Sequence, residues 1–576
     1  MTDTSDGVDQ EPINKEPVKK KKEKKSGLAP STIRIGKRYR PSRLDGSYDA
    51  IVIGSGIGGL TTAASMSKMG KKVLVLEQHY TAGGYTHSYS RNGYEWDVGV
   101  HYIGDMGYPT MGRKLFDFIT DGNLKWAAMD DNYDRIFLGD EEFNFVKGKE
   151  AFKDELKRKF PEERAVIDKY VYMIDEANKG MQWFTMGKLF KPWQQKALSL
   201  ATKRLMPEYF NRNTYEVLRE LTSNEKLIAV LTGQWGDCGM TPKKSAFVIH
   251  ALIAKHYFNG GYYPVGGASK IAETIIPVVQ ASGGEVFTYA SVEQILVEKG
   301  KAVGVRMKDG TDIRSPLVIS NAGVFNTFGR LLPESVSRKH GYDKKLKKVS
   351  PSYAHLGMYI GLKGDSKSHD LPSTNFWMYA DEKHDENTDK FFDDYKEPFP
   401  VVYVSFPSAK DPEFNSKYPG RSTIEIVAPT PYHIFEKWKD ETWGKRGEDY
   451  EELKEYFSQR MLEALYEKMP HLRGKIDYYE TSTPLSTDYF CYYSKGELYG
   501  IDHDMNRFDQ EWLQPKTSIP GLYLTGQDVL SAGVVGAMMA GFLTAGQIMG
   551  LKGLKLAKMS MFDKRKEPEQ WAIQME

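Results

Sequence analysis

Cysteine is scarce in this chain, which has only Cys238 and Cys491 among its 576 residues. So few thiols give no sign of a disulfide framework, and their scarcity predicts a protein of a reducing compartment. The twelve histidines do not indicate a metal site either, because no HExxH or paired-cysteine spacing occurs. We therefore expect neither structural disulfides nor a bound metal.

Long apolar runs are also absent. A membrane-spanning helix needs roughly 18 or more predominantly apolar residues, and no such uninterrupted run occurs. The nearest stretch, "SAGVVGAMMAGFLTAGQIMGL" from Ser531 to Leu551, is interrupted by glycine, serine, threonine and glutamine. Its composition favours a tightly packed core helix, and we predict no transmembrane helix.

Residues 1–47 are polar, poor in aromatic side chains and contain the basic run Lys19 to Lys25, which predicts a disordered tail. Basic residues are attracted to anionic lipid headgroups by on the order of 1 kcal/mol each. A merely solubilising tail is the alternative. No apolar segment follows the basic run, so we expect no signal peptide. Together these features predict a protein on the cytoplasmic side, with peripheral membrane contact and no nucleic-acid partner.

A glycine loop lies between two short apolar stretches near residue 54. Gly54, Gly56 and Gly59 match GxGxxG, a helix of small residues follows, and Glu77 ends the second stretch. In this context the glycines allow a tight turn and close approach to a pyrophosphate, while the carboxylate accepts hydrogen bonds from a ribose and repels a 2′-phosphate. The loop thus predicts an adenine dinucleotide other than NADP, with FAD and NAD both fitting.

Three further segments distinguish between these two cofactors. The stretch after Glu77 carries the pair Gly83 and Gly84, and "LYLTGQD" near the C-terminus carries Gly526 and Asp528 before a glycine-rich helix that includes Val535. These segments resemble the flavin-contacting motifs of the FAD-dependent amine oxidase and phytoene desaturase superfamily. The resemblance also places the backbone of Val292 against the adenine. It therefore implies that the cofactor is FAD.

The motifs "YPVGGASKIAETI", "YGIDHD" and "LYLTGQD" narrow this resemblance to the retinol saturase branch, over about residues 48–550. The branch implies a flavoprotein oxidoreductase that saturates a carbon–carbon double bond of a retinoid or carotenoid by hydride transfer from reduced flavin N5, with an electron donor that the sequence does not identify. Carotenoid cis–trans isomerisation or desaturation is the near alternative. A non-enzymatic prenyl or lipid carrier is the distant one.

The expected fold class is α/β, a Rossmann-like FAD-binding domain of the glutathione-reductase and amine-oxidase type, with an inserted α+β substrate domain of mixed sheet and helices. The chain is divided accordingly into a tail (1–47), FAD-binding segments (48–110, 256–335 and 476–555), a largely helical substrate and membrane-contact region (111–255), a substrate sheet with a long helix (336–475), and a C-terminal tail (556–576). Within 111–255, the mixture of aromatic side chains and lysines from Met181 to Phe210 is typical of an interfacial segment or of an ordinary amphipathic helix.

The proton donor for such a reaction is sought among side chains near the flavin. The resemblance places His101 and Tyr102 beside the isoalloxazine, and Tyr263 is the third candidate, because histidine titrates in the useful range and tyrosine can donate a proton. His256, Tyr257 and Asp504 are further candidates. For each of them a structural hydrogen bond is the alternative role.

Overall fold

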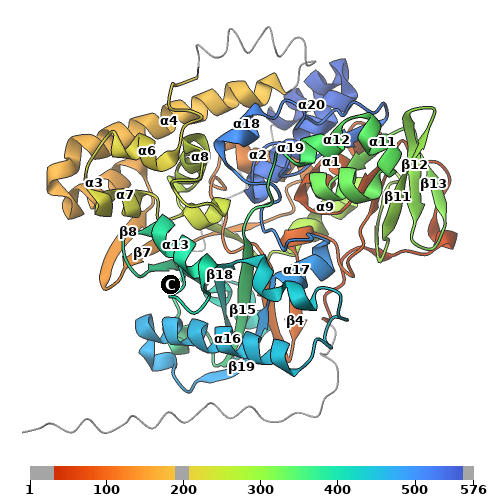
Figure 1. The fold of residues 1–576 in the computed structure, drawn as a ribbon. Helices are drawn as coiled ribbons and strands as arrows, with labels where there is room; N and C mark the ends of the chain where they lie inside the picture. The colour runs from red at the N-terminus through yellow and green to blue at the C-terminus, as the bar shows by residue number, and fades with distance from the viewer. Residues whose placement is uncertain (1–30, 189–205, 562–576) are drawn as a thin grey trace, which may run out of the picture.

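The computed structural model describes residues 31–188 and 206–561, which form two large sheets and three small ones with helices around them (Figure 1). One of the large sheets is parallel and holds the glycine loop. The other is mixed and belongs to the predicted insertions. Together they confirm the predicted Rossmann-like α/β fold with an inserted α+β region.

The parallel sheet has six strands in the order β1-β10-β3-β2-β14-β20. Its two central strands, β2 and β3, are apolar and fully buried, as expected for a parallel sheet covered on both faces. The strands are β1 (Lys37–Arg38), β2 (Ala50–Ile53), β3 (Val73–Leu76), β10 (Glu285–Thr288), β14 (Val318–Ser320) and β20 (Leu522–Leu524).

Helix α1 (Ile57–Ser67) follows β2 and is buried along its whole length. It packs between α9 (Lys270–Gln280) and α19 (Gly533–Met549). The hydroxyl of Thr62 on α1 donates to the carbonyl oxygen of Gly541 at 3.1 Å, so α1 and α19 touch nearly backbone to backbone. The apolar stretch before residue 551 is therefore a core helix, as its composition predicts.

Smaller elements complete the nucleotide region. A three-stranded antiparallel sheet follows β10, a hairpin follows the glycine pair, and a two-stranded ladder joins distant segments. These elements are β11 (Val292–Glu298), β12 (Lys301–Met307) and β13 (Asp312–Arg314); β4 (Ser88–Arg91) and β5 (Tyr94–Asp97); β6 (Trp126–Ala128) and β9 (Tyr262–Pro264); and the helices α2 (Met111–Ile119), α10 (Gly323–Asn326), α11 (Glu334–Lys339), α12 (Tyr342–Leu346), α17 (Pro484–Cys491), α18 (Met505–Asp509) and α20 (Leu551–Met561).

The mixed sheet has seven strands in the order β19-β15-β18-β17-β16-β7-β8. All neighbours are antiparallel except β16 and β7, which run parallel and join the two insertions. The strands are β7 (Asn132–Leu138), β8 (Glu141–Val146), β15 (Ala354–Lys363), β16 (Asn375–Tyr379), β17 (Val402–Ser405), β18 (Arg421–Thr430) and β19 (Ile476–Ser482). Strands β15, β16 and β17 are buried almost throughout, so both faces of the sheet centre are covered.

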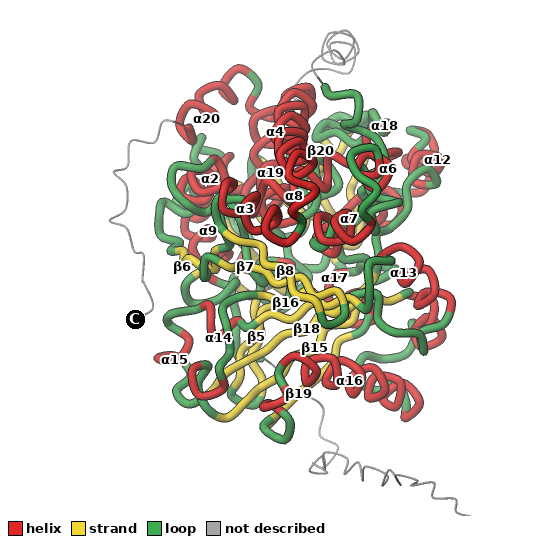
Figure 2. The backbone as a smooth tube through the Cα atoms, turned by 90° about the vertical axis from the view of Figure 1, so that its left-hand side faces the viewer, coloured by secondary structure: helices red, strands yellow, loops and turns green. Residues whose placement is uncertain are grey.

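Helices cover this sheet from two sides (Figure 2). The long helix α16 (Glu448–Lys468) packs on β17 and β19, as the amphipathic pattern predicts. The helical region after β8 packs on β8 and on itself. Its members are α3 (Lys149–Lys159), α4 (Arg164–Gly187), α6 (Thr214–Arg219), α7 (Glu225–Leu231) and α8 (Phe247–Tyr257), and the short helices α13 (His384–Asp393), α14 (Pro407–Lys410) and α15 (Phe414–Lys417) flank the sheet.

Two predicted boundaries need correction, those at residues 47 and 475. Residues 31–47 belong to the fold, because β1 pairs with β10 and the N–H of Ala82 donates to the carbonyl oxygen of Ile35 at 2.9 Å. Within 111–255, the strands β6, β7 and β8 accompany the helices, without changing the bounds of this region. The mixed sheet continues past residue 475 with β19, whose pairing partner β15 lies more than 100 residues earlier in the chain.

Among the helices of residues 31–188 and 206–561, none combines the length and apolar character needed to cross a bilayer. The predicted interfacial segment from Met181 to Phe210 falls largely on residues 189–205, outside the described residues. The basic run Lys19 to Lys25 lies outside them as well. Membrane contact therefore stays a prediction.

Candidate active site

A large cavity extends from the glycine loop to the mixed sheet. At the loop end it is lined by seven of the predicted cofactor residues, which are Gly54, Gly56, Glu77, Gly83, Gly84, Val292 and Asp528. At the other end it is lined mainly by aromatic and aliphatic side chains of the mixed sheet and of the turn at residue 235. Segments far apart in the sequence thus meet in one continuous cavity.

The glycine loop is shaped for a ligand that approaches the backbone. Gly54 has φ +93°, a left-handed conformation that glycine adopts without strain. A Cβ on Gly59 would lie 2.2 Å from the carbonyl oxygen of Gly54, so only glycine lets α1 start this close to β2. The loop leads into the N-terminus of α1, whose free N–H groups and positive dipole end suit a pyrophosphate.

Glu77 lies at the end of β3 with its carboxylate held by backbone and side-chain donors. Oε2 accepts from the N–H of Ser55 at 2.8 Å and from its hydroxyl at 2.7 Å, while Oε1 accepts from the N–H of His79 at 2.8 Å. The carboxylate both ties down the loop and lines the cavity, at the position predicted for a ribose contact.

Asp528 joins two chain segments at the other side of the loop end. Its Oδ2 accepts from the N–H of Val324 at 2.8 Å and its Oδ1 from the N–H of Ile501 at 3.1 Å.

Three predicted cofactor residues do not line the cavity. Gly59 and Gly526 are buried close to the loop, while Val535 packs against the α1 core and its neighbour Val534 lines the cavity instead.

His101 lines the cavity and forms a pair with a carboxyl group on β18. Its Nδ1 lies 2.8 Å from Oε2 of Glu425, whose Oε1 accepts from the N–H of Asp97 at 2.6 Å. Burial lowers the pKa of His101 to about 3 and raises the pKa of Glu425 to about 8. At neutral pH the pair is therefore a protonated carboxyl donating to a neutral imidazole, with the ring proton on Nε2.

Lys410 is buried behind this pair. Its ammonium donates to the carbonyl oxygen of His101 at 2.9 Å and to the hydroxyl of Ser405 at 2.7 Å, and it contacts the amide oxygen of Asn375. Burial lowers the pKa of Lys410 to about 7, while the carboxyl of Glu425 opposes this shift. A carboxylate formed at Glu425 would thus have a cation nearby.

Tyr102 and Tyr263, the other two predicted proton donors, lie outside the cavity lining. The hydroxyl of Tyr102 donates to Oδ2 of Asp134 at 2.8 Å, and that of Tyr263 donates to Asp97. Burial raises the pKa of both hydroxyls well above the usual value. Their positions favour the structural alternative, in which each tyrosine satisfies a buried carboxyl.

The additional candidates also have structural partners. Nε2 of His256 accepts from the N–H of Gly104 at 2.8 Å, and Asp504 caps the N-terminus of α18. Neither these two nor Tyr257 lines the cavity.

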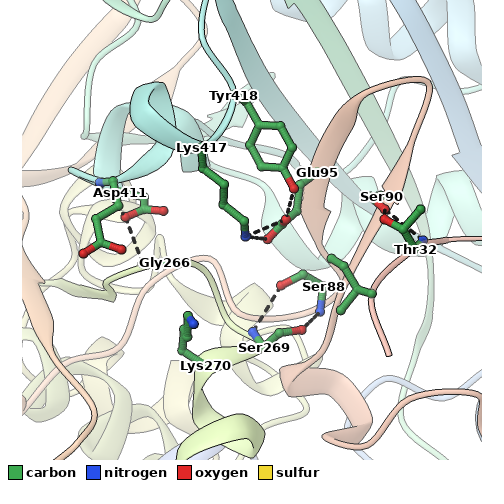
Figure 3. A network of polar contacts seen from close by, with 12 residues as sticks. Thr32, Ser88, Ser90, Glu95, Gly266, Ser269, Lys270, Asp411, Lys417 and Tyr418 are labelled. Carbon is green, nitrogen blue, oxygen red and sulfur yellow. Dashed lines mark hydrogen bonds and ion pairs between the residues drawn. The ribbon is translucent and has the colours of Figure 1, made fainter. Parts of the chain in front are cut away.

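The strand that carries Asp97 is anchored by a polar network at the junction of the two sheets (Figure 3). Lys417 donates to Oε1 of Glu95 at 2.9 Å, and Tyr418 donates to the same carboxylate. On the neighbouring strand, the N–H of Ser88 donates to the hydroxyl of Ser269 at 2.7 Å. These contacts fix β5, and with it the Asp97 N–H that holds Glu425.

Sequence reasoning missed Glu425, Lys410 and His355, all of which are buried in the mixed sheet or against it. A signal was present for the first of these, because Glu425 is the only charged residue in the apolar run "STIEIVAP". A carboxyl group in the middle of a buried strand is rare without a partner. His355 on β15 lines the cavity, and burial and the nearby His101 lower its pKa to about 4.

Comparison with known proteins places this geometry in context. The model of the NAD(P)-binding Rossmann-like domain family matches residues 52–119. The human protein "All-trans-retinol 13,14-reductase" is 39% identical over 532 residues, covering 89% of this chain and 87% of that one. A zebrafish relative, "Inactive all-trans-retinol 13,14-reductase", is 31% identical, covering 89% and 88%.

More distant matches agree with the fold. The carrot "Prolycopene isomerase, chloroplastic" is 26% identical and covers 93% of this chain and 86% of its own length. Among solved structures, cyclohexylamine oxidase from Brevibacterium oxydans superposes with a TM-score of 0.56 at 13% identity, covering 89% of this chain and 99% of that one. The predicted superfamily and the predicted branch within it are both confirmed.

Proposed function

The chain belongs to the family of all-trans-retinol 13,14-reductases, and we propose on that basis that it is a FAD-dependent oxidoreductase that saturates one carbon–carbon double bond of a polyene lipid, a retinoid in the first instance. The observation that carries the proposal is the position of the His101–Glu425 pair, in a cavity that connects a dinucleotide loop to an aromatic chamber. Such a cavity brings a cofactor, an apolar substrate and a proton source together.

FAD fits the residues at the loop end. The left-handed Gly54 and the α1 N-terminus would hold the pyrophosphate, Glu77 the adenosine ribose, Val292 the adenine, and Asp528 the ribityl side. When bound, FAD supplies a hydride from its reduced flavin N5. Residues of the chain have to bind the polyene, exclude water and deliver the proton.

The far end of the cavity suits a substrate with few polar groups. Trp235, Trp377 and Tyr403 line it, and all three are buried. Chambers lined by aromatic and aliphatic side chains bind apolar ligands and keep water out. A polyene such as a retinoid meets this description.

The proton comes from His101 through its pairing with Glu425. Nε2–H of the imidazole passes its proton to one carbon of the double bond as the carboxyl proton of Glu425 passes to Nδ1. The ring is neutral before and after the step, and the charge appears on Glu425, where the Asp97 N–H and the ammonium of Lys410 stabilise it. After the product leaves, a proton from solvent in the cavity returns to Nε2 of His101, and the proton on Nδ1 passes back to Glu425.

The rate of this proton transfer is expected to fall as pH rises. Glu425 must be protonated, and its raised pKa of about 8 means that the protonated fraction is full at pH 6 and falls through pH 8. Single-turnover mixing of reduced enzyme with polyene at a series of pH values measures this rate. In Glu425→Gln the side chain retains hydrogen bonds but has no proton to release, so we expect a lower rate without the decline near pH 8. A wild-type rate that stays flat to pH 9 would contradict the assignment.

Isomerisation without net reduction is the second candidate, because a prolycopene isomerase is among the relatives. A buried acid that releases one proton per turnover is needed for saturation, whereas an isomerisation returns every proton it takes. The His101–Glu425 pair therefore favours saturation.

The deciding experiment is anaerobic. The purified protein is checked for flavin absorbance, reduced, mixed with all-trans-retinol, and the product is weighed by mass spectrometry. Product heavier by two hydrogens together with reoxidised flavin is the expected result. An unchanged mass with altered chromatographic retention identifies an isomerase. No turnover of any polyene by flavin-loaded protein overturns the proposal.

A further inference from the structure

One carboxyl group lies in the aromatic part of the cavity, away from the dinucleotide loop. The acidic side chains of the lining are Glu77, Asp528 and Asp237, and the first two belong to the loop end. Asp237 stands instead on the turn η4 (Trp235–Cys238), among the rings of the chamber. A carboxyl at this place can hydrogen-bond a polar group of the ligand that the chamber binds.

The turn η4 packs closely against aromatic rings that line the cavity, and this packing fixes the position of Asp237. A Cβ on Gly236 would lie 2.7 Å from the ring of Trp377, and one on Gly239 would lie 2.9 Å from the ring of Tyr499. Cys238 closes the turn by donating to the carbonyl oxygen of Trp235 at 3.3 Å. The glycines thus place the Asp237 carboxyl directly beside the aromatic rings.

Two tyrosines, Tyr102 and Tyr257, hydrogen-bond the carboxyl of Asp237. The hydroxyl of Tyr102 lies 3.4 Å from its Oδ2, but the same hydroxyl is closer to Asp134, at 2.8 Å. Burial and the nearby Asp134 raise the pKa of Asp237 to about 8. At neutral pH it is a protonated carboxyl, which can donate one hydrogen bond and accept another.

Two further groups of the chamber lack partners. The indole N–H groups of Trp235 and Trp377 have no acceptor among the residues that the structure describes, although both side chains are buried and both line the cavity. Each N–H is enclosed by protein atoms and does not open into the cavity, so a ligand oxygen there meets the Asp237 carboxyl rather than an indole.

We propose that Asp237 binds the hydroxyl end of the substrate, so that the site selects a polyene alcohol over the corresponding hydrocarbon, ether or carboxylic acid. This inference rests on the proposed function. A hydroxyl group donates once and accepts once, which matches a protonated carboxyl. A carboxylate end would face Asp237 and Asp134 together, and the nearby cation, Lys410, is already bonded to His101, Ser405 and Asn375.

The anchor also restricts which double bond is reduced. The ring of Tyr403 lies 4.5 Å from that of Trp377 and 5.3 Å from that of His101, so one aromatic ring separates the anchor region from the proton donor. With the hydroxyl at Asp237, the bond beside His101 is one of those near the hydroxyl end of the chain. The distant end of the polyene occupies the remainder of the chamber.

The test uses flavin-loaded enzyme and two ligands, all-trans-retinol and its methyl ether. Quenching of tryptophan fluorescence gives each Kd without turnover, because Trp235 and Trp377 line the cavity. For the wild type we expect retinol to bind at least roughly tenfold more tightly than the ether, as one buried hydrogen bond to a hydroxyl provides. Asp237→Leu is expected to remove this difference, and Asp237→Asn to retain most of it.

Asp130→Asn, at an exposed position, is the matched control and should behave as the wild type. Equal Kd values for retinol and its ether in the wild type overturn the inference and leave the proposed function intact. An Asp237→Leu enzyme that still prefers retinol also overturns it. Failure of both ligands to bind overturns the proposed function itself. The wild-type comparison requires no variant to fold, so a misfolded Asp237→Leu does not leave the question open.

Discussion

Replacing His101 by phenylalanine is expected to slow reduction of the polyene by a factor of roughly 10²–10⁴, the usual contribution of a positioned general acid. Phenylalanine keeps an aromatic ring in the cavity wall but removes the Nε2 proton and the acceptor of Glu425. Flavin content and the rate at which dithionite reduces the flavin are expected to stay within about twofold of the wild type. Stopped-flow mixing of reduced enzyme with all-trans-retinol measures the affected step alone.

A second histidine provides the control for this variant. His256 lies outside the cavity lining and accepts a backbone hydrogen bond from Gly104, so His256→Gln should reduce the rate much less than His101→Phe. If His101→Phe reduces the polyene at the wild-type rate, the proton comes from another group, and the neutral pair with Glu425 has only a structural role.

Replacing Gly59 by alanine is expected to abolish flavin binding. The new Cβ would lie 2.2 Å from the carbonyl oxygen of Gly54 and 3.2 Å from the Cβ of Asn321, and the backbone atom at 2.2 Å cannot yield cheaply. The helix must then move away from β2, which displaces the N–H groups meant for the pyrophosphate. Overpacking of this kind costs about 1–3 kcal/mol of stability in addition.

The ratio of flavin absorbance to protein absorbance measures this effect, and thermal unfolding reports whether the fold persists. Gly546→Ala is the matched control, because that glycine lies in α19 with open space around its missing side chain. A folded Gly59→Ala protein that purifies with one flavin per chain would show that the loop does not hold the cofactor.

Much of the fold could be predicted because its signals are local. The glycine loop, the four strands from Ala354 to Thr430 and the helix α16 each carry their pattern within a short segment. Boundaries that depend on distant partners were wrong. Strand β1 is only two residues long and forms by pairing with β10 across about 250 residues, and no periodicity marks such a strand.

The candidate site was only partly predictable for the same reason. The cofactor residues follow a motif, but the partners of His101 come from β18 and from the end of α14, more than 300 residues away. Tyr102 follows His101 directly, yet its hydroxyl donates to Asp134 and its side chain does not line the cavity. Its place beside His101 in the sequence therefore suggested that Tyr102 is a proton donor. In the fold, the acid that pairs with His101 is Glu425, on a distant strand.

The parallel sheet also determines when this protein can become functional during synthesis. Its strands are drawn from almost the whole chain, and β20 at residues 522–524 is the last to be made. Until that strand and α19 leave the ribosome, β14 has an open edge and α1 lacks one of its two flanking helices. Strand pairs between distant segments form slowly, and the apolar strands stay exposed until their partners are available. The nascent chain is consequently expected to need chaperone protection until α19 has been made, and C-terminal truncations before residue 522 should yield insoluble protein.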